Sequence, residues 1–320
     1  MKKTINREHI EGRIYDHNLE IKVTGANSKV PNTTYIRGKI DVATDEDCCN
    51  VISVTFTYVT EKTSKGGNNN TFTALKNIIE NGKTILNNGK DEATMVSIDT
   101  ALALNDFISE RAITAENPKG FVSAKENNGG FLRIVSKLDQ NESKRNVFEV
   151  DMLINGVRLI EADETRDIPN DYLIVKGAVF NFKNDILPVE FSVRSKEGIS
   201  YFESLEASPS NMIFTKVWGS ITSETKINTK EEQSAFGDAV VTTYEKKVKD
   251  WQITGAATDP YEIGDAEHGI TVEEIQKALA DREVLKAKKE QDYEAYQAQK
   301  SVSAGPNNAG VSAAAGGFIF

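Results

Sequence analysis

The side chains best suited to chemistry in this 320-residue chain are basic and aromatic residues that alternate within short segments. In residues 35–39, 176–182 and 214–218, side chains two positions apart point to the same face if the segment is a β-strand. Aromatic rings stack on unpaired nucleobases with about 1–3 kcal/mol each, and Lys and Arg neutralise phosphates, so such faces suit single-stranded nucleic acid. The predicted phosphate contacts are Arg37, Lys39, Lys176 and Lys216, and the predicted stacking residues are Tyr35, Phe180, Phe182 and Trp218.

A structural role competes with this interpretation. An aromatic residue in a strand commonly packs in the core, and a neighbouring lysine can run its apolar stem along the core while its amine reaches water. For any one of these residues core packing is the commoner outcome. The recurrence of the pattern in three segments favours a binding surface for the set.

The overall charge limits which partners are possible. The chain has 48 acidic and 38 basic residues, a formal net charge of -10, and a pI near 5.1. This excludes a uniformly basic nucleic-acid binder, but net charge does not tell where the charges lie. Acidic turns such as residues 45–47 must therefore lie away from any nucleic-acid groove.

Enzyme and metal signatures are weak. The sequence Gly82-Lys83-Thr84 resembles the end of a phosphate-binding loop, but Asn77 stands where that loop requires glycine. The acidic cluster around Asp163 lacks a second spaced acidic motif, so a metal-dependent nuclease is the weakest alternative. We expect no enzymatic activity, no cofactor and no bound metal.

Cysteine content and hydropathy bear on the location. The adjacent Cys48 and Cys49 are the only cysteines, and a disulfide between neighbours strains the intervening peptide. The longest largely apolar stretch, residues 311–320, is well short of the ~20 residues that a membrane-spanning helix needs. We expect a protein of the reducing cytoplasm with no membrane span and no signal peptide.

Most of the sequence has the period-two pattern of antiparallel strands. In residues 52–58 the pattern places Ile52, Val54, Phe56 and Tyr58 on one buried face. Two helices are expected, at residues 73–80 and about 272–299. The second begins with a capping box, in which Thr271 and Glu274 satisfy each other's backbone amides.

The predicted organisation has four parts. Two β domains span residues 1–124 and 130–260, separated by a loop at residues 125–130 that is rich in Gly and Asn. A long helix at 270–300 and a flexible tail at 301–320 follow. A weak internal repeat supports two related domains, because Gly38 and Gly156 each precede an acidic pair by seven and eight positions.

Residues 35–40, 45–47 and 51–57 together resemble the opening of bacterial and phage single-stranded DNA-binding proteins. The resemblance implies OB-like antiparallel β-barrels and a tail whose tip, Phe318, Ile319 and Phe320, docks replication or recombination proteins. The acidic residues that usually flank the terminal phenylalanine of that family are missing here.

The leading hypothesis is a phage-type, two-domain protein that coats single-stranded DNA, possessing no catalytic site and able to form a homo-oligomer. The alternative is a structural or assembly protein of a virion. In that case the helix stripe of Val272, Ile275 and Leu279 would mediate self-assembly, although the same stripe equally fits a helix packed on its own β domain.

Overall fold

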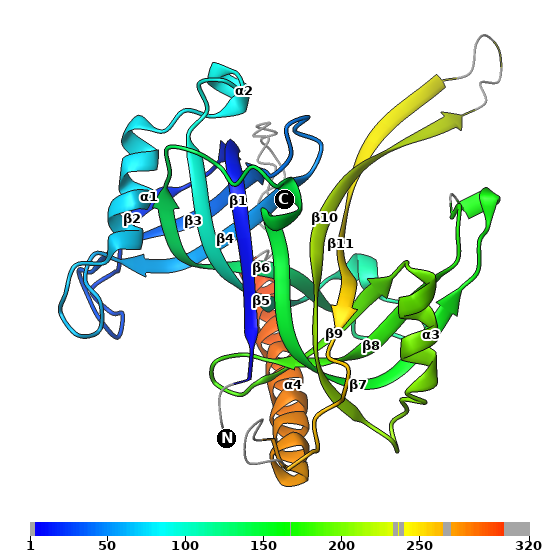
Figure 1. Ribbon diagram of the computed structural model, residues 1–320. Helices are drawn as coiled ribbons and strands as arrows, with labels where there is room; N and C mark the ends of the chain where they lie inside the picture. The colour runs from blue at the N-terminus through cyan, green and yellow to red at the C-terminus, as the bar shows by residue number, and fades with distance from the viewer. Residues whose placement is uncertain (1–3, 167, 233–235, 237–239, 265–269, 304–320) are drawn as a thin grey trace. The chain divides into compact units, whose positions relative to one another are not determined.

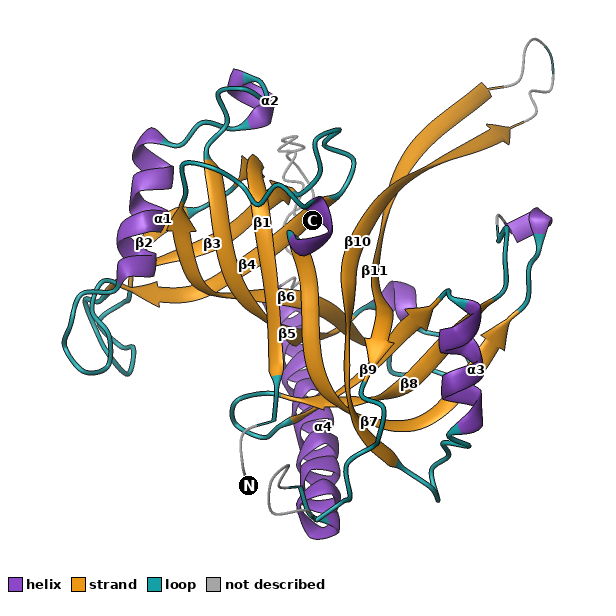
Figure 2. Cartoon of the chain, in the orientation of Figure 1, coloured by secondary structure: helices purple, strands orange, loops and turns teal. Residues whose placement is uncertain are grey.

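The computed structural model describes residues 4–166, 168–232, 236, 240–264 and 270–303. Strands dominate this part of the chain, and the long C-terminal helix α4 (Val272–Ser303) follows them (Figure 2). The predicted mainly β fold with a C-terminal helix is confirmed. Among the described residues, no helix is both long and apolar enough to cross a membrane. The tail residues Phe318, Ile319 and Phe320 lie outside the described residues.

The first half of the chain forms a five-stranded barrel. Its strands are β1 (Asn6–His17), β3 (Thr34–Ala43), β4 (Val51–Thr60), β5 (Met95–Ile108) and β6 (Phe121–Ile134). They are hydrogen-bonded in the order β1-β3-β4-β6-β5-β1, with a parallel pairing between β4 and β6. Helix α1 (Asn70–Asn81) lies between the third and fourth strands. This five-stranded arrangement is that of an OB fold.

The second half repeats the same arrangement. Its strands are β7 (Asn146–Ile160), β8 (Tyr172–Phe180), β9 (Ile186–Val193), β10 (Ile213–Glu232) and β11 (Val240–Ala256), with α3 (Lys196–Ser204) after the third. The order is β7-β8-β9-β11-β10-β7, again with parallel third and fifth strands. The β10–β11 hairpin continues past its barrel as a long two-stranded arm (Figure 1). Both halves are thus OB barrels.

Smaller elements complete the described part of the chain. These are the edge strand β2 (Glu20–Val23), helix α2 (Ile85–Asn88) and three short 3-10 helices at Glu110–Ala112, Glu142–Lys144 and Glu164–Arg166. The chain divides into two compact units. Unit 1, Met1–Asn105 with Ala124–Leu279, contains nearly all of both barrels, and unit 2 contains the tip of the β5–β6 hairpin, Asp106–Ser123, with α4 from Ala280 onward.

The predicted loop at residues 125–130 is wrong, because these residues lie inside β6. Asn127 is buried and donates a hydrogen bond from Nδ2 to the carbonyl of Ser53 at 2.9 Å. A Cβ at Gly129 would lie 2.3 Å from the ring of Phe56, so this glycine makes room for a core aromatic ring. The first barrel therefore runs to Ile134, and the division into separately folding domains stays a prediction.

The sequence repeat does not correspond to the duplication. Gly38 lies in the second strand of the first barrel, whereas Gly156 lies in the first strand of the second barrel. The two glycines are therefore not equivalent positions. The real repeat is in the order of strand pairing, which a single sequence motif does not record.

Helix α4 packs on the second barrel at its N-terminal end. The predicted capping box is present, with Glu274 Oε2 accepting from the Thr271 amide at 3.0 Å and Thr271 Oγ1 accepting from the Glu274 amide at 3.2 Å. Ile275 and Ala278 are buried in a cluster with Phe180 and Phe214. Of the stripe proposed for self-assembly, Ile275 is thus a core residue of this chain.

The two barrels are joined through β1, whose first residues pair with β7. At this junction Glu8 is buried, and its carboxylate accepts hydrogen bonds from Trp251 Nε1 at 2.8 Å and from Thr100 Oγ1 at 2.7 Å. Burial raises the pKa of Glu8 to about 7, although the two hydrogen bonds and the charge of Lys125 act in the opposite direction. Burial likewise lowers the pKa of Lys125 to about 8.

Glu8 makes stability depend on pH. An unfolded glutamate loses its proton near pH 4.3, whereas folded Glu8 keeps it to about pH 7. Stability therefore falls as pH rises through this window, because the folded state binds more protons. We expect Glu8→Gln to raise the free energy of unfolding at pH 8 by up to about 3 kcal/mol and to change it little at pH 4. Urea unfolding at both pH values measures this, and equal effects at the two pH values would contradict it.

Gly38 in β3 permits a close approach of the β1–β2 turn. Its φ is +135°, and a Cβ there would lie 2.6 Å from the Asn18 carbonyl oxygen and 2.8 Å from the Leu19 Cα. We expect Gly38→Ala to cost about 2–3 kcal/mol of unfolding free energy from strain and collision. Gly25→Ala is the matched control, because no atom lies within 4 Å of its added Cβ. Equal denaturation midpoints for the two variants would contradict the assignment.

Candidate nucleic-acid interface

A tyrosine pair, one ring exposed and one partly buried, lies on the outer face of the second and third strands of the first barrel. Ile36 of β3 pairs with Val59 of β4, but Gly38 pairs with Phe56, so β4 carries one extra residue between these pairs. This β-bulge turns Tyr58 away from the core, which reverses the predicted orientation. Tyr58 is 49% exposed, and its ring centroid lies 4.7 Å from that of Tyr35.

Cations flank the tyrosine pair. Arg37 and Lys39 are exposed on the same strand as Tyr35. Arg37 lies 3.7 Å from Glu20, which also contacts Lys22 at 2.8 Å, and Lys39 lies 4.0 Å from Glu126. Exposed pairs at such distances contribute little and exchange readily with other anions. Tyr35, Tyr58, Arg37 and Lys39 form what we call the tyrosine face.

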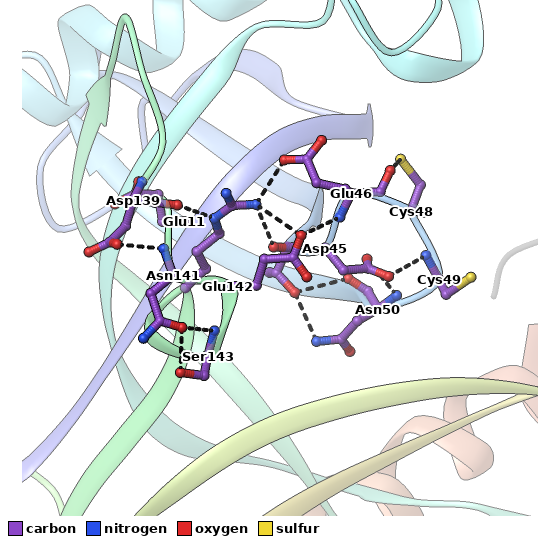
Figure 3. A network of polar contacts seen from close by, with 12 residues as sticks. Glu11, Asp45, Glu46, Cys48, Cys49, Asn50, Asp139, Asn141, Glu142 and Ser143 are labelled. Atoms are coloured by element: carbon purple, nitrogen blue, oxygen red, sulfur yellow. Dashed lines mark hydrogen bonds and ion pairs between the residues drawn. The ribbon is translucent and has the colours of Figure 1, made fainter.

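The acidic turn lies at the other end of the β3–β4 hairpin. About eight residues of strand, roughly 26 Å, separate Tyr35 from this turn. Asp45 accepts hydrogen bonds from the backbone amides of Cys49 and Asn50 at 3.0 and 2.9 Å (Figure 3). The buried Arg145 donates to Glu46 Oε1 at 3.1 Å and to the Asp139 carbonyl at 2.7 Å. The turn is thereby tied to the segment that connects the barrels.

Lys90 also contacts the acidic turn. Its amine lies 2.9 Å from Glu46 Oε2, and hydrogen bonds from Lys90 and then Arg145 hold the pKa of Glu46 below its usual value. Cys48 and Cys49 are free thiols, and burial raises the pKa of the Cys48 thiol. A thiol with a raised pKa is a poor nucleophile, so Cys48 is poorly suited to covalent chemistry.

A second candidate surface is a cleft of about 1170 Å³ that contains Lys216 and Trp218. The neighbouring strands β10, β7, β1 and β5 contribute to it, together with the acidic turn. We call it the tryptophan cleft, and the lining residues used below are Arg7, Asp45, Asp99, Glu149, Lys216 and Trp218. Asp45 lines it, so this cleft does not meet the condition that the acidic turn lies away from the groove.

The indole of Trp218 is partly exposed and packs on the neighbouring strand. It stands opposite Gly255 of β11, and a Cβ on Gly255 would lie 2.4 Å from the indole Nε1. The ring therefore lies against the bare backbone of the glycine, and the residue stays 39% exposed. The amine of Lys216 lies 5.8 Å from the ring centroid. The structure thus brings these two predicted residues together.

The third predicted set is not one surface. Phe180 is 1% exposed and packs edge-on against Phe214, so its predicted stacking role is wrong, because α4 covers this end of the strand face. Phe182 is 76% exposed but lies in the turn after β8, with Lys183 over its ring. Lys176 lies on the outer face of β8, where it pairs with Glu190 at 3.4 Å.

Two residues of the tryptophan cleft, Arg7 and Glu149, cannot be predicted from the pattern of a single strand. Arg7 and Glu149 lie 142 positions apart and stand opposite each other in the β1–β7 pairing. No local pattern in the sequence marks such a pair. Tyr58 was equally hidden, because the alternation of residues 52–58 gives no sign of the bulge.

Unit 2 is held together by polar contacts between α4 and the β5–β6 hairpin tip. The buried Arg282 makes a two-pronged ion pair with Asp106 at 2.5 and 2.7 Å and donates to Ser123 at 2.9 Å. Lys119 pairs with Glu290, and Tyr293 donates to Glu110 at 3.1 Å. Within the described residues, no group of three or more His, Cys, Asp or Glu side chains is arranged to hold a metal ion.

Comparison with known proteins identifies the family of this chain. No curated protein matches the chain. Among solved structures, the chain is similar to a deletion mutant of the single-stranded DNA binding protein from Thermus aquaticus, with 10% identity, a TM-score of 0.45, and coverage of 83% of this chain and 100% of that one. The sequence profile of the YorF family matches residues 4–292, and the protein therefore belongs to the YorF family.

Proposed function

We propose that the protein binds single-stranded DNA without catalysing a reaction, and that the tyrosine face makes the main contact. The observation that carries this proposal is the contact of the exposed Tyr58 with the partly buried Tyr35, flanked by Arg37 and Lys39. It lies on the second and third strands of an OB barrel, which is the face that OB folds use for oligonucleotides.

The geometry supports stacking of unpaired bases on the tyrosine rings. A ring that is half exposed offers area to a base without first leaving the core, and its π-face accepts any of the four bases. Arg37 and Lys39 extend from alternate positions of the same strand and would neutralise the phosphates that follow. The weak ion pairs with Glu20 and Glu126 would exchange for phosphate contacts.

The cellular role follows as part of the same proposal. The protein would coat and protect single strands during DNA replication or recombination in a phage-infected cytoplasm. Phe318, Ile319 and Phe320 would recruit partner proteins. The virion hypothesis loses one of its supports, because Ile275 of the helix stripe is buried against this chain's own barrel.

Replacing Tyr58 tests the tyrosine face. We expect Tyr58→Ala to weaken binding of a labelled oligothymidine by about 5- to 150-fold, since one stacked base contributes about 1–3 kcal/mol. Fluorescence anisotropy at two salt concentrations measures this. The salt dependence of binding should stay unchanged, because no cation is removed.

Tyr296→Ala is the matched control, because Tyr296 is a 61% exposed tyrosine on α4 outside both barrels. It should bind as the unaltered protein does. Equal affinities for the Tyr58 and Tyr296 variants would assign the binding to another surface, and an unaltered protein that does not bind single strands would refute the proposed function.

A further inference from the structure

The tryptophan cleft contains two cations that share one carboxylate. Arg7 donates to Glu149 Oε2 from Nε at 2.9 Å and also from Nη2. Lys216 Nζ lies 3.2 Å from the other oxygen, Oε1. All three residues belong to adjacent strands, β1, β7 and β10. Glu149 therefore occupies the position between two converging positive groups.

This position suits any anion with two or more oxygens. Arginine binds carboxylates and phosphates through the same fork of donors, and lysine adds a point charge. Partial burial alone would raise the pKa of Glu149, but the hydrogen bonds from Arg7 and Lys216 outweigh it, so the pKa is lowered. Glu149 is ionised at neutral pH and cancels positive charge in this part of the cleft.

A base platform stands beside the occupied anion position. Trp218 pairs with Glu149 in the sheet register, so the indole and the carboxylate are neighbours across the strands. Gly255 supports the indole from the adjacent strand β11. A half-exposed ring beside two cations is the combination that single-stranded nucleic acid requires.

We propose that the tryptophan cleft is a second nucleotide subsite, in which Glu149 occupies the phosphate position and thereby limits the affinity for single-stranded nucleic acid. This inference rests on the proposed function. A bound strand stacks a base on Trp218 and competes with Glu149 for Arg7 and Lys216. The four other acids that line the cleft have partners of their own. Asp45 accepts from backbone amides, and Asp99 pairs with Arg133 at 3.3 Å. Glu142 accepts from the Glu46 amide at 3.1 Å, and Glu8 is buried against Thr100 and Trp251.

Glu149→Gln tests the subsite, because it keeps the shape of the side chain and removes its charge. We expect severalfold tighter binding of oligothymidine at low salt. The slope of log affinity against log salt should steepen by about 0.7 for each cation that reaches a phosphate, or about 1.4 for both. Denaturation midpoints establish that the variant is folded.

Two further variants separate a subsite from a general charge effect. Glu92→Gln removes the same charge from an exposed pair with Lys83, at 2.6 Å, outside the cleft. A gain as large as that of Glu149→Gln would overturn the inference. Trp218→Ala, combined with Glu149→Gln, should abolish the gain, and a gain that persists in the combined variant would also overturn it.

The outcomes distinguish this inference from the proposed function. If the unaltered protein binds and Glu149→Gln binds equally or more weakly, Glu149 is only a scaffold and the proposed function stands. If only Glu149→Gln binds, the subsite is supported and the tyrosine face is not the main contact. If neither protein binds, both proposals are wrong.

Discussion

The hydrogen-bonded pairing of strand β1 with three neighbours is the interaction that holds the fold together, because this pairing joins the two barrels. It closes the first barrel through β3 and β5 and joins the second barrel through β7. Where the pairings with β5 and β7 overlap, Glu8 is buried between Thr100 and Trp251. A buried carboxyl group is costly unless it is hydrogen-bonded and able to hold its proton. The same pairing places Arg7, on the opposite face of the strand, beside Glu149 and so builds the tryptophan cleft.

Local departures from regular strand geometry create both candidate surfaces. The extra residue in β4 moves Tyr58 from the core to the tyrosine face, since a single inserted residue reverses the alternation of side chains. In the second barrel, Gly255 leaves room for the indole of Trp218, which then lies flat and half exposed. Elsewhere the same device serves packing, as Gly129 does for Phe56. Gly129 and Gly255 therefore make room for aromatic rings.

Charge in this acidic protein is arranged as pairs. Arg37, Lys39, Lys176 and Lys216 each have a carboxylate within 4.0 Å. These ion pairs differ in burial and in geometry. The contacts of Arg37 and Lys39 are long and exposed. Glu149, by contrast, receives three hydrogen-bonding or ionic contacts in a partly buried position. The tyrosine face is therefore the more accessible of the two surfaces to a polyanion. In the tryptophan cleft, by our proposal, Glu149 limits the affinity for single-stranded nucleic acid.

The sequence by itself determined the mainly β class, the long capped helix α4 and the cationic side of β3, because each depends on periodicity or on contacts within a few residues. It also marked Lys216 and Trp218 as neighbours. Only the tertiary structure decided that Phe180 is core, since α4 covers it from almost a hundred residues away. It likewise decided that residues 125–130 form a strand, which lies between β5 and a parallel partner, β4, some 70 positions earlier. Only the tertiary structure likewise shows that Arg7 lies beside Glu149 and that a bulge turns Tyr58 outward. Strand register and helix docking are set by long-range packing, which leaves no local signal in the residues that it brings together.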